Sequence, residues 1–444
     1  MTTTIDALRR AADAARASGD HETAIAKYSE ALALVPAEGD PEREYMLRSG
    51  RADSAFLWGS YPLADADIGA LQALARGNLA REVEVIERQV LLWRTRGQAA
   101  NGRDMAEAML GRVAGQPRLE AICLFALAVS SYSLGDYPRL HAATERLEGL
   151  AAQLGEPAIN LRALHASVGA NILAGQFDLA LQRGERYSAL ARAEADRLNE
   201  AQALNFLGIV ASDLAKQIAY SKEALLLYEA LGVREREATA RYNLGIGYQK
   251  LGLFGQAQAC FQHALQIMRA IGSYDSMSYP LFGLGDVLLE IGHPGEASAM
   301  FAEGRTNAEA SGALRTVLHC QAGIARAILS HSPGEAAAQL RAVADAFGER
   351  GIFGEQAYAL GWLGAAQLAA GDIPAALAST AAAIALTDAG HTFEDYGSME
   401  VCWWRYQALR AAGDDAAADE ALRRTYTILL GRVSTLGDAG LRRN

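Results

Sequence analysis

The sequence has little cysteine and no long apolar segment. Only four cysteines occur in 444 residues, scattered without a CxxC pair, so no disulfide framework is indicated and a reducing compartment is favoured. The N-terminal segment lacks the apolar core of a secretory signal. The most apolar run, 121–131, is far shorter than the ~20 residues that a membrane helix needs. These absences predict a cytoplasmic protein that does not enter a membrane.

Positive charge is also in deficit. The chain carries 41 basic and 52 acidic side chains, a formal net charge of −11. A general nucleic-acid binder needs a positive surface to neutralise phosphates, so direct nucleic-acid binding is not expected. The near-average share of hydrophobic residues, 51%, excludes a disordered chain.

The familiar motifs of catalysis and cofactor binding are missing. There is no HExxH, GxSxG, P-loop or GxGxxG sequence, and the fragments GIG (245–247) and GLG (283–285) have no strand before them. His319 and Cys320 are the only neighbouring histidine and cysteine, and adjacent residues on a helix point ~100° apart. We therefore predict no catalytic residue, no metal site and no cofactor, and a protein that is not an enzyme.

What the sequence does contain is a degenerate internal repeat. A pattern of small and apolar residues with a central glycine opens the chain and returns most clearly in two later stretches. Its residues are Leu8, Ala11, Ala12, Ala15, Gly19, Asp20, Ala24, Tyr28, Ala31 and Pro36, then Leu244, Gly245, Tyr248, Gly252, Ala257, Phe261 and Ala264, then Leu284, Gly285, Leu288, Gly292, Ala297 and Phe301. This pattern resembles the tetratricopeptide repeat, a helix–turn–helix unit of 34 residues.

Eleven such units fit the chain, each a few residues longer than the family's 34. They start near residues 5, 45, 83, 121, 161, 201, 238, 278, 318, 357 and 399. The resemblance implies an all-α fold, an α-solenoid in which helical hairpins stack into a right-handed superhelix over 1–430. Residues 431–444 form a tail. Long units of this kind resemble the arrays of bacterial multidomain signalling proteins.

Glycine, alanine and proline test this frame. Position 15 ends the first helix of a unit and requires a residue that tolerates the left-handed conformation. It is glycine in nine units: Gly19, Gly59, Gly97, Gly135, Gly175, Gly252, Gly292, Gly371 and Gly413. Position 20, where the two helices approach closely, is alanine in eight units. None of the ten prolines falls inside an expected helix, except in the first turn at Pro280.

The sixth unit, 201–237, departs from the pattern. Ala215 stands where the glycine belongs, so we expect polar residues around Lys216 to make the turn. The irregularity is either drift in a degenerate repeat or a hinge near the middle of the array.

Two adjacent tryptophans stand in the last unit. Because neighbouring helical residues point in different directions, one of Trp403 and Trp404 should pack inward while the other lies nearer the surface. The pair is either a cap on the last hairpin or an aromatic anchor for a partner.

The resemblance also implies a partner-binding groove. In the tetratricopeptide family, positions 2, 5, 6, 9, 12 and 13 of each first helix face the ligand on the concave side. Amides at such positions can clamp a peptide backbone, and tyrosines add rigid contact area. In units five to ten these positions give ten groove residues: Gln202, Asn205, Tyr242, Asn243, Gln249, Tyr279, Phe282, Asp286, Arg326 and Tyr358. The same positions hold Arg162, His165, Thr239 and His319.

Three functions remain open from the sequence. The chain is a non-catalytic interaction scaffold or sensor that binds a protein or peptide partner, a regulator that senses a small molecule or signalling peptide, or an enzyme with an unrecognised site. The final segment, TLGDAGLRRN, resembles the stretch that leads from such arrays into an output module. The chain is accordingly either the sensor part of something larger or complete at Asn444.

Overall fold

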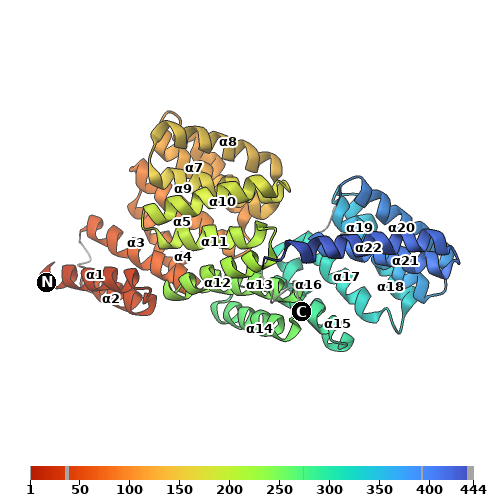
Figure 1. Ribbon diagram of the computed structural model, residues 1–444. Helices are drawn as coiled ribbons and strands as arrows, with labels where there is room; N and C mark the ends of the chain where they lie inside the picture. The colour runs from red at the N-terminus through yellow and green to blue at the C-terminus, as the bar shows by residue number, and fades with distance from the viewer. Residues whose placement is uncertain (1, 36–39, 274, 392–393, 438–444) are drawn as a thin grey trace. The chain divides into compact units, whose positions relative to one another are not determined.

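The computed structural model describes residues 2–35, 40–273, 275–391 and 394–437 and contains helices connected by short turns, with no strand in these ranges (Figure 1). The first half of the chain forms α1 (Thr2–Ala17), α2 (His21–Ala33), α3 (Pro41–Trp58), α4 (Tyr61–Leu74), α5 (Leu79–Thr95), α6 (Ala99–Arg112), α7 (Pro117–Leu134), α8 (Tyr137–Leu154), α9 (Pro157–Leu173), α10 (Phe177–Ala193), α11 (Arg197–Val210) and α12 (Leu214–Ala230). The second half forms α13 (Arg234–Lys250), α14 (Phe254–Ile271), a 3-10 turn (Asp275–Met277), α15 (Ser278–Glu290), α16 (Pro294–Ser311), α17 (Leu314–Ile328), α18 (Pro333–Gly348), α19 (Phe353–Ala369), α20 (Ile373–Asp388), α21 (Glu394–Ala411) and α22 (Asp415–Thr435). Consecutive helices pair as hairpins, so the predicted α-solenoid is confirmed.

The small residues of the repeat occupy the places that the frame assigned to them. All nine glycines of position 15 have positive φ, between 67° and 89°. Ala24, Ala64, Ala180, Ala257 and Ala297 of position 20 are completely buried. Apart from Pro36, which lies outside the described residues, every proline lies within the first three residues of a helix, where its missing N–H disturbs no helical bond.

The glycines of the GLG fragment make room for aromatic rings. A Cβ at Gly283 would lie 2.8 Å from the ring of Phe261, and a Cβ at Gly285 would lie 2.5 Å from the ring of Phe301. Phe261 and Phe301 are completely buried between their helices. Helix packing therefore accounts for the pattern that resembles the start of a dinucleotide-binding loop.

The chain divides into two compact units. Unit 1 comprises Met1–Ser212, Lys216–Gly247 and His263–Ser276, and unit 2 comprises Asp213–Ala215, Tyr248–Gln262 and Met277–Asn444. The division passes through α13 and α14. A single array over 1–430 stays a prediction, and α22 continues to Thr435, five residues into the segment expected to be a tail.

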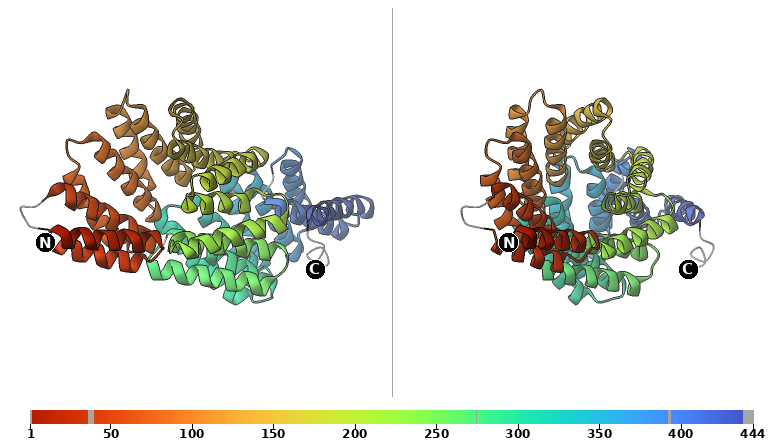
Figure 2. Two further views of the ribbon diagram at one scale, coloured as in Figure 1. Left: turned by 60° about the vertical axis from the view of Figure 1, so that its left-hand side comes forward. Right: turned by 90° about the vertical axis from the view of Figure 1, so that its left-hand side faces the viewer.

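Unit 1 closes on itself. The turn between α1 and α2 packs against the turn between α12 and α13, where the His21 Nε2–H donates to the carbonyl oxygen of Leu231 over 2.8 Å. Ile271, at the end of α14, is buried in the core that α3, α4 and α5 share. Figure 1 shows the ends of α1 and α2 meeting the end of α12, and Figure 2 gives two further views of the same helices. We call this contact between the two ends of unit 1 the seam.

Two glycines allow the backbones to approach closely at the seam. A Cβ at Gly232 would lie 2.4 Å from the carbonyl oxygen of Gly19, and a Cβ at Gly19 would lie 2.5 Å from that of Ala230. Both glycines also have positive φ. Across the seam, the Arg94 guanidinium of α5 pairs with Glu235 of α13 over 3.4 Å.

The turn of the sixth repeat lies earlier than expected. α11 ends at Val210 and α12 begins at Leu214, so Lys216 lies in a helix and the prediction of a turn around it is wrong. The Asp213 carboxylate accepts a hydrogen bond from the backbone N–H of Ala215 over 2.9 Å. This bond gives a partner to one of the N–H groups that the first turn of α12 leaves without a helical acceptor. An aspartate thus begins this helix after a three-residue turn that contains neither glycine nor proline.

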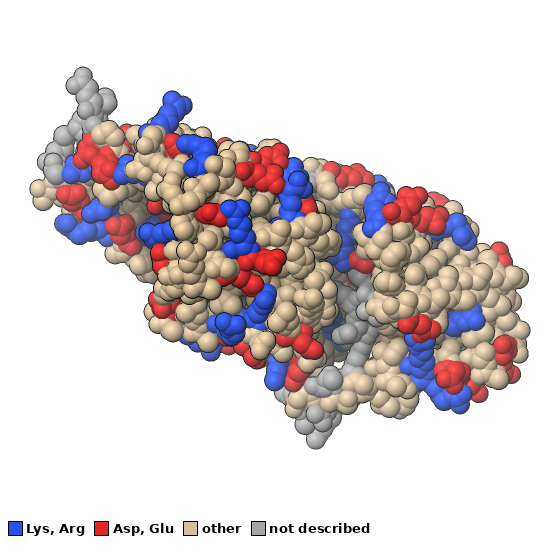
Figure 3. Space-filling view, turned by 90° about the horizontal axis from the view of Figure 1, so that it is seen from above, with Lys and Arg blue, Asp and Glu red and all other residues tan. Residues whose placement is uncertain are grey.

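Charges of both signs are interspersed on the face seen in Figure 3, separated by uncharged side chains. No helix in the described ranges is both long and apolar enough to cross a lipid bilayer.

Candidate ligand-binding site

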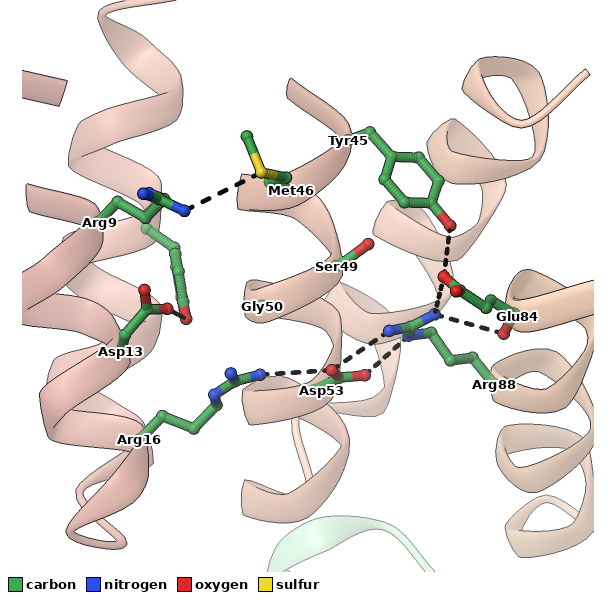
Figure 4. Close-up of a pocket in the computed structure, with 11 residues that line it drawn as sticks. Arg9, Asp13, Arg16, Tyr45, Met46, Ser49, Gly50, Asp53, Glu84 and Arg88 are labelled. Atoms are coloured by element: carbon green, nitrogen blue, oxygen red, sulfur yellow. Dashed lines mark hydrogen bonds and ion pairs between the residues drawn. The ribbon is translucent and has the colours of Figure 1, made fainter. Parts of the chain in front are cut away.

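Unit 1 contains a cavity of about 350 Å³ on the inner side of its first three hairpins (Figure 4). We call it the N-terminal pocket. Its walls come from α1, α3 and α5, with one ring from α2. The lining residues are Arg9, Asp13, Arg16, Tyr28, Tyr45, Met46, Ser49, Gly50, Asp53, Glu84 and Arg88.

Helical spacing brings these side chains to one surface. Arg9, Asp13 and Arg16 follow one another at four and three residues along α1, and therefore share one face of that helix. Met46, Ser49, Gly50 and Asp53 repeat this spacing on α3, and Glu84 and Arg88 lie one turn apart on α5. A ligand in the pocket would touch three successive repeats.

Nine of the eleven residues occupy groove positions of the repeat; Tyr28 and Tyr45 do not. In the frame of the sequence these nine stand at positions 5, 9 and 12 of the first unit, 2, 5, 6 and 9 of the second, and 2 and 6 of the third. The groove residues predicted from the sequence begin only at the fifth unit and therefore do not include this pocket. The rule itself was the signal that could have found it.

An ionic bridge fixes the lower wall of the pocket as drawn in Figure 4. The Asp53 carboxylate accepts from the Arg88 Nε over 2.8 Å and from the Arg16 Nη1 over 3.4 Å, and so joins α1, α3 and α5. The Tyr45 hydroxyl donates to Glu84 over 3.1 Å. Burial, with the Glu84 carboxylate nearby, raises the pKa of Tyr45 to about 12. Tyr45 therefore stays a neutral donor at physiological pH.

Gly50 lets an aromatic ring form the back of the pocket. A Cβ at Gly50 would lie 2.4 Å from the Tyr28 ring, so a side chain at position 50 would clash with this ring. The buried Tyr28 hydroxyl donates to the Asp13 carboxylate. Burial and this hydrogen bond raise the pKa of Tyr28.

Two polar groups of the pocket lack a good partner. The Arg9 Nη1 reaches only the Met46 thioether sulfur, at 3.9 Å, and a thioether is a weak acceptor. The Arg9 Nε and the Ser49 hydroxyl are both buried without a hydrogen bond from the described residues.

Four of the ten predicted groove residues lie in unit 1. On α11, Gln202 accepts from the Tyr228 hydroxyl over 3.4 Å, and Asn205 accepts from the Asn243 amide of α13 over 2.9 Å. Gln202 and Asn205 are 8% and 5% exposed, and so offer a ligand little surface, whereas Tyr242 and Asn243 are half-buried.

The inner side of α5 and α9 carries a second polar cluster in unit 1. The Arg162 guanidinium donates through two nitrogens to Glu87, at 2.8 and 3.1 Å. His165 lies edge-on to the rings of Phe125 and Phe206, 5.4 and 5.1 Å between ring centres. Burial, followed by the charges of Arg236 and Arg94, lowers the pKa of His165 to about 3, so this imidazole is neutral.

The other six predicted residues belong to unit 2. Tyr279 is 48% exposed, Gln249 lies near the end of α13, and Phe282 packs against the His319 ring at 5.7 Å. Asp286 accepts from the Arg326 Nη1 over 2.7 Å. Burial raises the pKa of Tyr358. None of these six residues lines the N-terminal pocket.

The neighbourhood of Arg326 includes residues that the groove rule had not selected. Its guanidinium lies over the Trp362 ring, 4.5 Å from the ring centre. The Trp362 Nε1 donates to Glu400 over 2.9 Å, and the Trp404 ring lies 5.0 Å away from the Trp362 ring. Trp404 thus packs against another helix, while Trp403 is 39% exposed, as expected for adjacent tryptophans.

Comparison with known proteins agrees with the repeat pattern. The tetratricopeptide repeat family matches residues 236–310. A search of curated protein sequences found no match.

Solved structures share the fold over most of the chain. A Rap protein complexed with competence and sporulation factor is 11% identical, covers 80% of this chain and 99% of its own, and has a TM-score of 0.61. The apo form of RapI is 12% identical, covers 79% and 99%, and has a TM-score of 0.50. Aspartyl phosphate phosphatase F from Bacillus subtilis is 12% identical, covers 80% and 95%, and has a TM-score of 0.51.

The family match over 236–310 and the stacked hairpins place the fold in the class of helical solenoids to which tetratricopeptide-repeat proteins belong. Within this class, the arrangement of its helices is similar to that of the Rap proteins. At this level of identity the similarity concerns the fold alone.

Proposed function

We propose that the chain is a non-catalytic sensor that binds a short peptide on the inner side of unit 1, through the N-terminal pocket. The observation that carries this proposal is a cavity of about 350 Å³ built mainly from the groove positions of three consecutive repeats. Its ionic bridge and buried tyrosines hold the walls in place before a ligand arrives, which reduces the entropy cost of binding.

The size of the pocket favours a short peptide over a folded partner. Ligand sites for small molecules usually measure about 300–1,000 Å³. A cavity near the lower end of this range holds a few side chains, whereas a folded protein would need a broad contact surface. A small molecule is the alternative occupant. The ten predicted groove residues remain candidates for contacts beyond the pocket, in unit 1 through Gln202, Asn205, Tyr242 and Asn243.

The neighbours support a regulatory function. The Rap protein with the highest TM-score quoted above was solved in complex with a named factor, so this fold accommodates a bound effector. The phosphatase in the comparison bears the name of an enzyme, but a shared fold at 12% identity transfers no reaction. We assign no catalytic residue to the chain.

Selection from a peptide mixture tests the proposal. The full-length chain is incubated with a random pentapeptide library, and mass spectrometry identifies the bound peptides. Met46→Trp places a large ring at the 41% exposed rim of the pocket and should abolish selective retention. Leu226→Trp, at a 65% exposed position of α12 away from the pocket lining, is the matched control and should bind as the wild type does. Equal retention by both variants would locate binding outside the pocket, and no retention by the wild type would contradict the proposal.

A further inference from the structure

The geometry points to an anionic group, a carboxylate or a phosphate, as the part of the ligand that Arg9 and Ser49 bind in the N-terminal pocket. This inference rests on the proposed function and specifies the chemistry of the ligand. The donors and acceptors of the pocket differ in whether they already have hydrogen-bond partners within the protein.

The carboxylates of the pocket already accept hydrogen bonds from the protein. Asp53 accepts from two arginines and Glu84 from the Tyr45 hydroxyl, and Asp13 accepts from the Tyr28 hydroxyl. Each of these carboxylates is therefore already the acceptor of at least one hydrogen bond from a side chain of the pocket.

The donors at the opposite end are incompletely used. Within the described ranges, Arg9 forms no ion pair, and its hydrogen bond to the Met46 sulfur over 3.9 Å is the weakest kind of acceptor contact. Its Nε and the Ser49 hydroxyl are buried and unsatisfied. A ligand oxygen that replaced the sulfur would gain a charge-assisted hydrogen bond and displace almost nothing.

Geometry restricts where the anion can lie. Arg9 reaches from α1 to Met46 of α3, and Ser49 lies three residues after Met46 on α3 (Figure 4). Asp13 lies one turn further along α1, and its negative charge disfavours an anion at that depth. The anionic group is therefore expected beside Arg9, Met46 and Ser49, and the rest of the ligand extends along the pocket toward Asp53.

The test compares matched peptide libraries on the full-length chain. Three random pentapeptide libraries are N-acetylated: one has a free C-terminal carboxylate, one a C-terminal amide, and one a C-terminal amide with a phosphoserine at the last position. Retention of the first indicates a carboxylate and retention of the third indicates a phosphate. Either result is expected together with poor retention of the plain amide library.

Three variants link the result to the two residues. Arg9→Gln should weaken binding of the retained library roughly ten- to a hundred-fold, the effect typical of losing a hydrogen bond to a charged group. Arg9→Lys should restore part of the affinity, and Ser49→Ala should cost less than Arg9→Gln. Arg10→Gln, a change of the same kind on the exposed side of the same helix, should have no effect.

The outcomes separate this inference from the proposed function. If the plain amide library binds as well as the other two and Arg9→Gln changes nothing, the anionic assignment is wrong while the peptide sensor stands. If no library is retained, the proposed function fails and this inference fails with it.

Discussion

Replacing Gly232 by alanine should open the seam of unit 1. Gly232 has a φ of 64°, a conformation that L-residues adopt only at a cost of about 1–2 kcal/mol. The added Cβ would also lie 2.4 Å from the Gly19 carbonyl oxygen and 3.0 Å from the His21 ring. Neither neighbour is the free end of a flexible chain, so the two turns must separate. Overpacking of this kind adds about 1–3 kcal/mol. The expected cost is the sum, about 2–5 kcal/mol.

Gly135→Ala provides a matched control. Gly135 has nearly the same φ, 67°, but a Cβ there would meet nothing within 4 Å. This variant carries the backbone strain without the clash. The difference between the two variants, about 1–3 kcal/mol, therefore measures the seam alone.

Hydrogen exchange of the full-length chain is the assay. Gly232→Ala should speed amide exchange at both sides of the seam, in the α1–α2 turn and in the α12–α13 turn, although these lie about 210 residues apart in the sequence. Gly135→Ala should affect only the neighbourhood of α7 and α8. If Gly232→Ala costs no more than Gly135→Ala, or if its effect stays at α12 and α13, the seam does not hold unit 1 closed.

Other perturbations test the seam, a buried ion pair and the repeat frame. Burial lowers the pKa of His21 below its ordinary 6.5. The neutral imidazole therefore stabilises the seam above pH 6.5, and this contribution is lost as the pH falls from there. Amide exchange at the α12–α13 turn, corrected for intrinsic rates, should rise on acidification in the wild type and much less in His21→Asn. Asp67 is completely buried and pairs with Arg48 at 2.9 Å and Arg51 at 2.7 Å, so Asp67→Ala should destabilise unit 1 by about 3 kcal/mol in denaturant unfolding, and an unchanged transition would contradict the ionic assignment. Ala257 is completely buried, so Ala257→Leu should cost about 1–3 kcal/mol. Exchange should become faster near α13 to α15 and stay unchanged in α7 and α8, which have no described contact with α14; equal loss of protection in both places would refute the expectation that damage stays with packed neighbours.

Local rules of backbone and packing made most of the fold predictable. A positive φ after a helix favours glycine, so nine glycines located the turns between paired helices, although Ala195 also adopts a positive φ. Close helix contacts require alanine, and the alanines of position 20 are buried. The position of the turn at Ala211–Asp213 could not be predicted, because an aspartate cap takes the place of glycine there. Such caps are common outside repeats as well.

The seam and the unsatisfied groups of the pocket could not be predicted from repeat positions. His21 and Leu231 meet only after six hairpins have curved back on themselves, and the repeat pattern does not specify that curvature. The groove rule could have named Arg9, Ser49 and Asp53 as inward-facing residues. It could not have shown that Asp53 binds two arginines while Arg9 is left with a thioether, because that depends on distances between neighbouring repeats.

The central claim is that the ligand occupies the N-terminal pocket, and protection of a thiol in that pocket tests it most directly. Met46→Cys places a thiol at the 41% exposed rim, while three native cysteines, Cys123, Cys320 and Cys402, are buried. Cys260 is half-buried and is replaced by alanine in the background. Saturation with the retained peptide library should slow the reaction of the Met46→Cys thiol with a maleimide at least ten-fold, and should leave the Leu226→Cys thiol on α12 unaffected. An unchanged rate at the pocket, with binding intact, would contradict the account.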